Sequence, residues 1–133
     1  MKYCIVLSMF ALGACSKPVA SGGDGPSDIV VPVLRYATDS GSIERGNRLF
    51  TIKGCAGCHS FGRGKLIGPD LQGVTARRTL PWLERMILKP EVMIREDPAA
   101  KALFGQYMAA MGNQSVDPET ELGPILSFLK AHE

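Results

Sequence analysis

The sequence predicts an all-α domain over residues 40–133, and three observations support that fold class. Apolar residues recur at helical spacing in four segments. Asp-Pro pairs at 97–98 and 117–118 stand where two of those segments begin, as a cap followed by a first-turn proline. No segment alternates apolar and polar residues for long enough to predict a β-strand. A chain of 133 residues is long enough for one modest domain.

The first helix is expected over residues 42–53, with Ser40 or Ser42 as its N-cap. Gly54 follows and is expected to end the helix in the left-handed conformation. A Gly-rich loop without helical periodicity then extends to about Gln72. The apolar stripe of this helix includes one small residue and consists of Ile43, Gly46, Leu49 and Phe50.

The second helix is expected over residues 80–89, with Pro81 in its first turn and Pro90 as its stop. The third is expected over residues 98–107, with Asp97 as its N-cap. Both segments carry a start signal, and the apolar face of the second helix consists of Trp82, Leu83, Met86 and Ile87.

The last helix is expected to open at Asp117-Pro118 and to run to the C-terminus, with the apolar residues Ile125, Leu126, Phe128 and Leu129. Gly123-Pro124 conflicts with that span, because proline inside a helix loses a hydrogen bond and clashes with the preceding turn. Two interpretations are open. The helix kinks at Pro124, which we prefer, or it starts near Pro124 after a short turn.

Residues 1–14 are predicted to be an export signal and not part of the fold. Lys2 supplies a positive start, and residues 4–12 are an apolar run too short to span a membrane. Leu-Gly-Ala at 12–14, followed by Cys15, resembles the lipobox of bacterial lipoproteins. That resemblance implies cleavage before Cys15 and a lipid on its sulfur. The alternative is a plain secretory signal with an incidental cysteine.

Residues 15–39 are predicted to be a lipid-anchored flexible tether. They are rich in Gly, Ser, Pro and Asp, which bury too little apolar surface to fold. The expected location is outside the cytoplasm, on a membrane that faces the periplasm. Ser16 in place of Asp after the lipidated cysteine resembles lipoproteins of the outer membrane, if the host is Gram-negative.

Cys55-Ala-Gly-Cys58-His59 is the motif that carries chemistry. Two thiols separated by two residues can add to two vinyl groups of one haem, and the adjacent histidine can ligate the iron from below. The motif therefore predicts one covalently bound haem c. Three other interpretations compete with it: a thioredoxin-like redox pair, which needs a βαβ frame; a zinc site, which needs a second ligand pair; and a structural disulfide.

Residues 42–132 resemble a class I cytochrome c domain. An amphipathic helix leads into the CxxCH motif, and residues 67–73 match the Gly-Pro-x-Leu-x-Gly loop of that family. The resemblance implies that the Pro69 carbonyl accepts a hydrogen bond from His59. It also implies that Phe128 of the last helix packs against the first helix.

Four methionines after residue 14 are candidates for the sixth iron ligand. Met86 and Met93 lie in helical or helix-flanking positions that favour packing. Met108 and Met111 precede the last helix, where the family places its ligand. Alignment on a bacterial subgroup with a Tyr-x-x-x-Met-Pro-Asn segment puts Met111 at the ligand position, with Gly112 where that subgroup has proline.

These features predict an electron-transfer protein and not an enzyme, because two axial ligands leave no iron position for a small-molecule substrate. Fifteen basic and thirteen acidic residues leave the chain nearly neutral, which argues against nucleic acid as a partner. The expected partners are redox proteins, met through basic residues near the motif such as Arg63 and Lys65. A haem enzyme or sensor with a labile Met111, and a fixed subunit of a membrane complex, are the alternatives.

Overall fold

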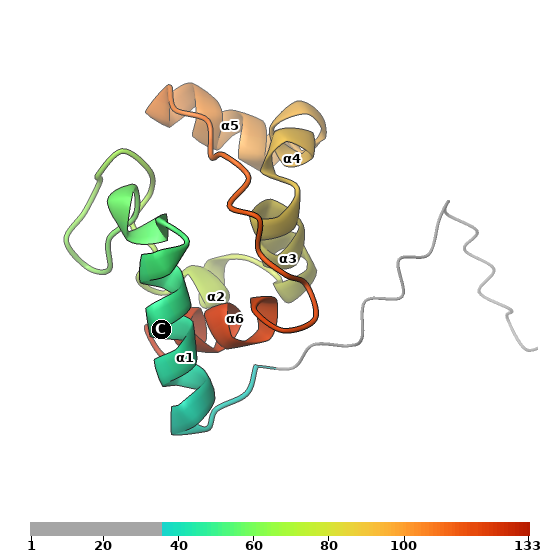
Figure 1. Ribbon diagram of the computed structural model, residues 1–133. Helices are drawn as coiled ribbons and strands as arrows, with labels where there is room; N and C mark the ends of the chain where they lie inside the picture. The colour runs from blue at the N-terminus through green and yellow to red at the C-terminus, as the bar shows by residue number, and fades with distance from the viewer. Residues whose placement is uncertain (1–35) are drawn as a thin grey trace, which may run out of the picture. The chain divides into compact units, whose positions relative to one another are not determined.

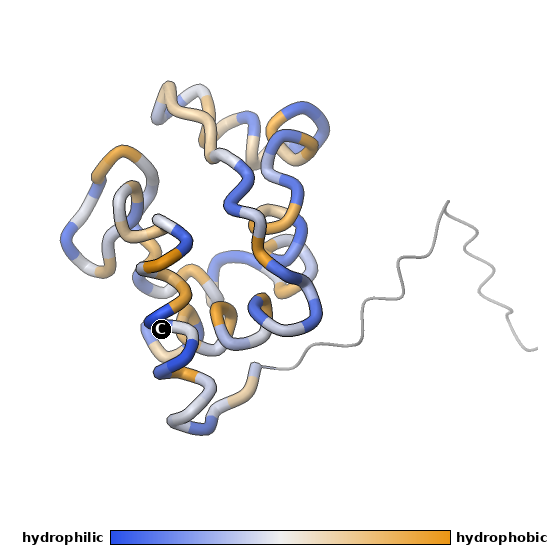
Figure 2. Tube along the Cα trace, in the orientation of Figure 1, coloured by the Kyte–Doolittle hydropathy of each residue, from blue (hydrophilic) through white to orange (hydrophobic). Residues whose placement is uncertain are grey.

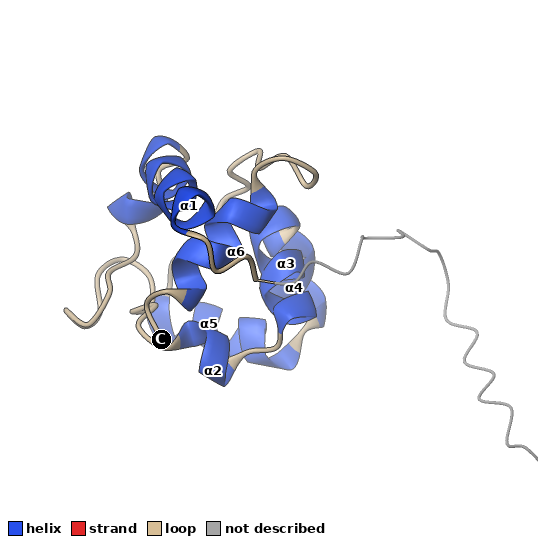
Figure 3. Ribbon diagram, turned by 90° about the horizontal axis from the view of Figure 1, so that it is seen from below, coloured by secondary structure: helices blue, strands red, loops and turns tan. Residues whose placement is uncertain are grey.

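The computed structural model describes residues 36–133. The predicted export signal, Cys15 and the tether up to residue 35 lie outside the described residues. The described part is helical and contains no strand, which confirms the all-α prediction (Figure 3). No helix in this part is long and apolar enough to cross a membrane.

Six α-helices and one 3₁₀ helix make up the domain (Figure 1). In Figure 1, α1 and α6 cross in the lower part of the domain, α3, α4 and α5 lie to the right and above, and the segment after α5 returns to α6. The elements are α1 Ser40–Ile52, η1 Cys55–Gly57, α2 Val74–Arg77, α3 Leu80–Leu88, α4 Pro90–Glu96, α5 Pro98–Tyr107 and α6 Leu122–Lys130.

The crossing of α1 and α6 is the most extensive contact between helices of residues 36–133, and a glycine makes their close approach possible. A Cβ atom at Gly46 would lie 2.0 Å from the Pro124 carbonyl oxygen and 2.7 Å from the Phe128 Cβ. Beside this point the rings of Phe50 and Phe128 pack with their centroids 5.3 Å apart. The predicted packing of Phe128 on the first helix is therefore confirmed.

The core lies mainly along α6 and the elements that cover it. Figure 2 shows apolar positions on α6 and on the helices around it. Tyr36 packs against this core from the start of the described chain, and the Lys130 Nζ lies 5.6 Å from its ring centroid. The buried apolar cluster consists of Phe50, Val74, Leu83, Val116, Leu122, Ile125, Leu126, Phe128 and Leu129.

The start of α1 differs from the prediction. The N-cap is Asp39, whose carboxylate accepts a hydrogen bond from the Ser42 backbone N–H at 2.8 Å, and not Ser40 or Ser42. Asp39 has the extended conformation that a cap needs, and its charge suits the positive end of the helix dipole. Gly54 has a φ of 78° after the helix, as predicted.

The preferred interpretation of Pro124 is wrong. The last helix has no kinked first half, because α6 begins at Leu122 and residues 117–121 form a separate turn. Pro124 is then the third residue of the helix, where its missing N–H would have had no intrahelical partner. The turn is closed by Asp117, which accepts from the Thr120 N–H at 2.7 Å, and by Glu121, which accepts from the Asp117 N–H at 2.8 Å.

The second and third predicted helices are confirmed as α3 and α5, the latter with Asp97 accepting from the Ala100 N–H at 2.9 Å. Two short helices, α2 and α4, were not predicted. Pro90 ends α3 and is also the first residue of α4, so a proline taken only as a stop also starts a helix.

Candidate functional site

A cavity of about 420 Å³ opens into the middle of the domain, and its lining is mostly apolar. Residues from the CxxCH segment, the loop after it, α3, α5 and the segment after α5 all contribute to its wall. The five haem-site residues predicted from the sequence line this one cavity: Cys55, Cys58, His59, Pro69 and Met111. Residues up to 56 positions apart in the chain therefore meet where the sequence predicted one site.

The two cysteines lie on a tight turn formed by η1. Gly54 starts the turn, and the Cys55 carbonyl accepts hydrogen bonds from the N–H groups of Cys58 at 3.1 Å and His59 at 3.0 Å. Both thiols are free, Cys55 being half-buried and Cys58 exposed. Burial raises the pKa of the Cys55 thiol. The turn thus presents two unpaired thiols at the cavity wall.

His59 is held by the loop that follows it. Its Nδ1 lies 2.9 Å from the Pro69 carbonyl oxygen, so Nδ1 carries the proton and donates to that carbonyl. The other ring nitrogen, Nε2, is then unprotonated and free to bind a metal. Gly68 packs against the ring, because a Cβ there would lie 2.8 Å from the His59 Cε1.

The methionines fall into different environments. Met108 is 79% exposed, ends α5 in the left-handed conformation and does not line the cavity. Met93 is buried, in line with its predicted packing role. Met111 and Met86 both line the cavity, so α3 supplies a second thioether that the sequence pattern assigned to packing.

Comparison with known proteins places this site in a family. The family model for cytochrome c matches residues 43–132. The chain belongs to the cytochrome c family. No curated protein was significantly similar to it.

Solved structures of bacterial cytochromes c share the fold. Cytochrome c from Rhodothermus marinus is 30% identical with a TM-score of 0.69, over 80% of this chain and 88% of that one. An engineered form of the Rhodothermus marinus protein, described as bound to a carbene intermediate, is 30% identical with a TM-score of 0.65, over 80% and 88%. The cytochrome c domain of the pp3183 protein from Pseudomonas putida is 34% identical with a TM-score of 0.56, over 65% and 85%.

As a member of the cytochrome c family, the protein is an electron-transfer haem protein with haem c attached through Cys55 and Cys58. The residues present fit this group. The wall of the cavity is apolar, the two thiols are free, and His59 keeps one ring nitrogen available. Among residues 36–133, no three His, Cys, Asp or Glu side chains converge on a metal position, as a zinc site would require.

Two basic residues, Arg77 and Arg78, line this cytochrome's cavity. Arg77 donates to the carbonyl oxygens of Gln72 and Asp70, the latter at 3.1 Å, and Arg78 lies 4.7 Å from the ring centroid of Trp82. Lys53 has a different role, because it pairs with Glu121 at 2.6 Å and ties α1 to the start of α6.

Sequence reasoning missed Asp70. Its carboxylate accepts hydrogen bonds from the N–H groups of Gly62, Gly64 and Gln72 at 2.9, 2.7 and 2.8 Å. Those N–H groups hold the pKa of the Asp70 carboxyl well below its usual range. The available signal was the pair of glycines at positions 62 and 64, both with positive φ, which let the loop turn its N–H groups inward.

Proposed function

We propose that this cytochrome carries single electrons between respiratory redox proteins outside the cytoplasm, with His59 and Met111 as the residues that would hold the haem iron. The main support is that the His59 imidazole, whose tautomer is fixed by its hydrogen bond, and the Met111 thioether line the same apolar cavity. When bound, the haem iron supplies the one-electron ferric–ferrous couple.

The residues of the chain adjust that couple. Donation from the His59 Nδ1–H to Pro69 fixes the ring and makes the imidazole a stronger donor. A thioether from Met111 favours the ferrous state and raises the potential relative to two imidazoles. The apolar wall, to which Leu83 and Ile125 contribute, keeps water from the site. Arg77 and Arg78 are placed at the wall where they can pair with the carboxylates of the haem.

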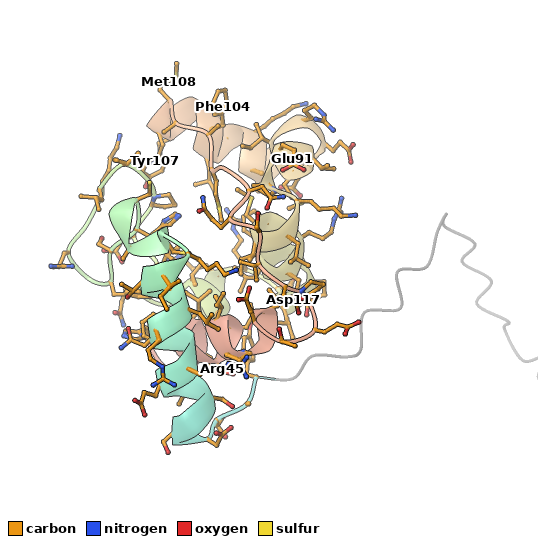
Figure 4. All side chains as sticks on the ribbon, viewed as in Figure 1. Arg45, Glu91, Phe104, Tyr107, Met108 and Asp117 are labelled. Carbon is orange, nitrogen blue, oxygen red and sulfur yellow. The ribbon has the colours of Figure 1, made fainter. Side chains whose placement is uncertain are left out.

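Two segments supply an exposed apolar surface beside the cavity, on which we propose that the redox partner docks. Ile67 and Phe104 line the cavity while being 56% and 40% exposed, and Met108 lies with Phe104 at the end of α5 (Figure 4). Lys65 lies next to this surface, with its Nζ 4.8 Å from the Tyr107 ring centroid. A partner with an apolar centre and an acidic rim fits this pattern.

The experiment is a redox titration of the holoprotein combined with a ligand-binding measurement. A carrier with two protein ligands titrates reversibly with one electron, and the wild type does not bind added carbon monoxide rapidly in the ferrous state. Rapid binding by the wild type, together with turnover of a small molecule, supports the second candidate, a haem enzyme or sensor. That candidate draws on Gly112, which has no Cβ and stands beside Met111 where the resembling subgroup has proline.

We also propose that Cys15 is lipidated and anchors the protein to a membrane facing the periplasm. The support is the sequence pattern at residues 12–15 and the Gly-, Ser- and Pro-rich stretch after it. Mass measurement of native protein tests this. Acylated material that starts at Cys15 is expected, and unacylated material with another start contradicts the anchor while leaving the haem site intact.

A further inference from the structure

We propose that Asp70 is a positioning residue: it holds the Pro69 carbonyl against His59 and thereby sets the strength of the axial imidazole. The proposal rests on the proposed role of His59 as an iron ligand. Asp70 does not touch His59, and its effect passes through the backbone of its own loop.

The Asp70 carboxylate closes the loop after the CxxCH motif. Besides the three N–H groups described above, the Ser60 hydroxyl lies 3.0 Å from Asp70 Oδ2. Among residues 36–133, no other acceptor binds a backbone N–H of residues 61–65. Within residues 61–65, the backbone N–H groups that are bound therefore all depend on Asp70, and the Ser60 hydroxyl adds a contact to the Gly64 carbonyl oxygen at 2.5 Å.

The same loop aligns the two residues that share the hydrogen bond. The Gly68 N–H donates to the Cys58 carbonyl at 2.8 Å, and the Leu71 N–H donates to the Ser60 carbonyl at 2.8 Å. Along the chain, His59 lies between the two acceptors, Cys58 and Ser60. Pro69 and Asp70 lie between the two donors, Gly68 and Leu71. Loss of the Asp70 contacts loosens one end of this pairing, and the distance from His59 Nδ1 to the Pro69 oxygen of 2.9 Å is no longer enforced.

The effect on the iron follows from the chemistry of the imidazole. A strong Nδ1–H···O=C bond makes the imidazole more basic and stabilises the ferric state. A weaker bond therefore raises the reduction potential. Removal of the Asp70 charge also raises the potential by Coulomb's law, so the potential alone does not separate positioning from charge.

The test compares Asp70→Asn with Asp70→Glu in the full-length holoprotein. The first measurement is the exchange rate of the His59 Nδ1–H with solvent, by NMR in the ferrous state. Asp70→Asn is expected to exchange on the order of tenfold faster and to have a higher potential. Asp70→Glu keeps the charge but moves the carboxylate by one methylene, and it is expected to speed exchange as well.

Asp117→Asn is the matched control. Asp117 also carries a negative charge and accepts backbone N–H groups, from Glu119 at 3.0 Å and Thr120 at 2.7 Å, but in a turn without contact to the His59 loop. It is expected to leave the exchange rate of the His59 proton unchanged. If Asp70→Asn does not yield holoprotein, Ser60→Ala removes the hydroxyl that lies 3.0 Å from Asp70 Oδ2 and 2.5 Å from the Gly64 carbonyl oxygen, and it is expected to give a smaller increase in the same direction.

Wild-type exchange in Asp70→Asn, or in Ser60→Ala where the first does not fold, overturns the proposal. Wild-type exchange in Asp70→Glu also overturns it, since charge alone is then sufficient. Equal acceleration in Asp117→Asn overturns it too, because general destabilisation then explains the effect. Failure of the proposed ligation by His59 can be told apart from failure of the Asp70 proposal. In that case, the His59 ring protons of the wild type would lack the strong upfield shift of an iron-bound imidazole.

Discussion

Two segments face the haem cavity of this protein, and they are built differently. Residues 58–73, which contain the His59 loop, are fixed by backbone pairing and by the contacts of one carboxylate. Residues 109–116, which contain Met111, make no backbone-to-backbone hydrogen bond with any described residue. They are tied down by side chains: Asn113 donates to the Leu88 carbonyl at 3.3 Å, and Lys53 donates to the Ser115 carbonyl at 2.9 Å.

This difference in hydrogen bonding indicates different roles for the His59 segment and the Met111 segment. On the histidine side, hydrogen bonds within the chain hold His59 and its partner, the Pro69 carbonyl, in place. On the methionine side, the chain has few internal constraints, and the proposed bond from Met111 to iron would supply part of the order. We therefore expect the methionine to be the more easily displaced ligand.

The largest expected effect is the loss of covalent haem attachment, on which both sides of the site depend. Replacing Cys55 and Cys58 together by Ala removes both thioether links, so haem is no longer held covalently. Denaturing gels stained for haem are expected to show no signal for the double variant. A Cys15→Ser variant, which lacks a different cysteine, is expected to keep the stain, and full retention in the double variant would refute haem attachment at this motif.

The next effect concerns the free energy of unfolding and compares a glycine in α1, which leads into the CxxCH motif, with a glycine in α5, which precedes the Met111 segment. Gly46→Ala in α1 forces a Cβ to within 2.0 Å of the Pro124 carbonyl, and a backbone atom cannot rotate away. The expected loss in the free energy of unfolding is about 3 kcal/mol, measured by urea titration of the holoprotein.

Gly105→Ala is the matched control for that variant. Gly105 lies in α5, and a Cβ there meets nothing within 4 Å. Since alanine favours the helix by up to about 1 kcal/mol, this variant is expected to be as stable as the wild type or more so. Equal losses in the two variants would show that the α1–α6 crossing is not the sensitive contact.

A smaller effect sharpens the contrast on the methionine side. Asn113→Ala removes the donor to the Leu88 carbonyl and the acceptor of the Ser115 N–H, which is bound at 2.8 Å. Because the variant loses both hydrogen bonds and the segment is then less ordered, added imidazole is expected to bind the ferric iron on the order of tenfold more tightly. An optical titration measures this, with exposed Gln106→Ala as the control, and unchanged affinity would mean that the segment is ordered by other contacts.

The smallest effect is the pH dependence of stability from Asp70. Its folded-state pKa lies below the unfolded value, so its contribution is complete above the unfolded pKa of about 4 and declines as the pH falls through and below it. The difference in urea midpoint between the wild type and Asp70→Asn is therefore expected to shrink from about pH 6 to pH 3. A difference that grows toward acid would contradict this sign.

The sequence predicted those elements whose signals are local. Asp97 capped the predicted helix, Gly54 ended the first, and the CxxCH motif lay on the cavity as expected. The prediction at Pro124 was wrong because the free-energy cost of a proline depends on its position relative to the start of the helix. That start is set by the turn at residues 117–121, in which the Asp117 N–H donates to the Glu121 carboxylate. The seven-residue α4 was too short to show a period.

The site was predicted less completely than the fold. Met111 and Pro69 came from resemblance, and the structure brings both to the cavity. Asp70 escaped notice because its partners are backbone N–H groups, which residue types do not reveal directly, and the glycines at positions 62 and 64 were the only signal. Met86 was assigned to packing because helical spacing marks the buried side of α3 but does not reveal that this side faces a cavity.

The central claim is that His59 and Met111 hold the iron of one haem, and the ferric absorption spectrum tests it most directly. A thioether bound to ferric haem gives a weak band at the red end of the spectrum. We expect this band to be present in the wild type, to be lost in Met111→Ala, and to be kept in Met108→Ala, whose side chain is 79% exposed, and in Met86→Leu. A band that survives in Met111→Ala and disappears in either of the other two variants would show that Met111 does not bind the iron.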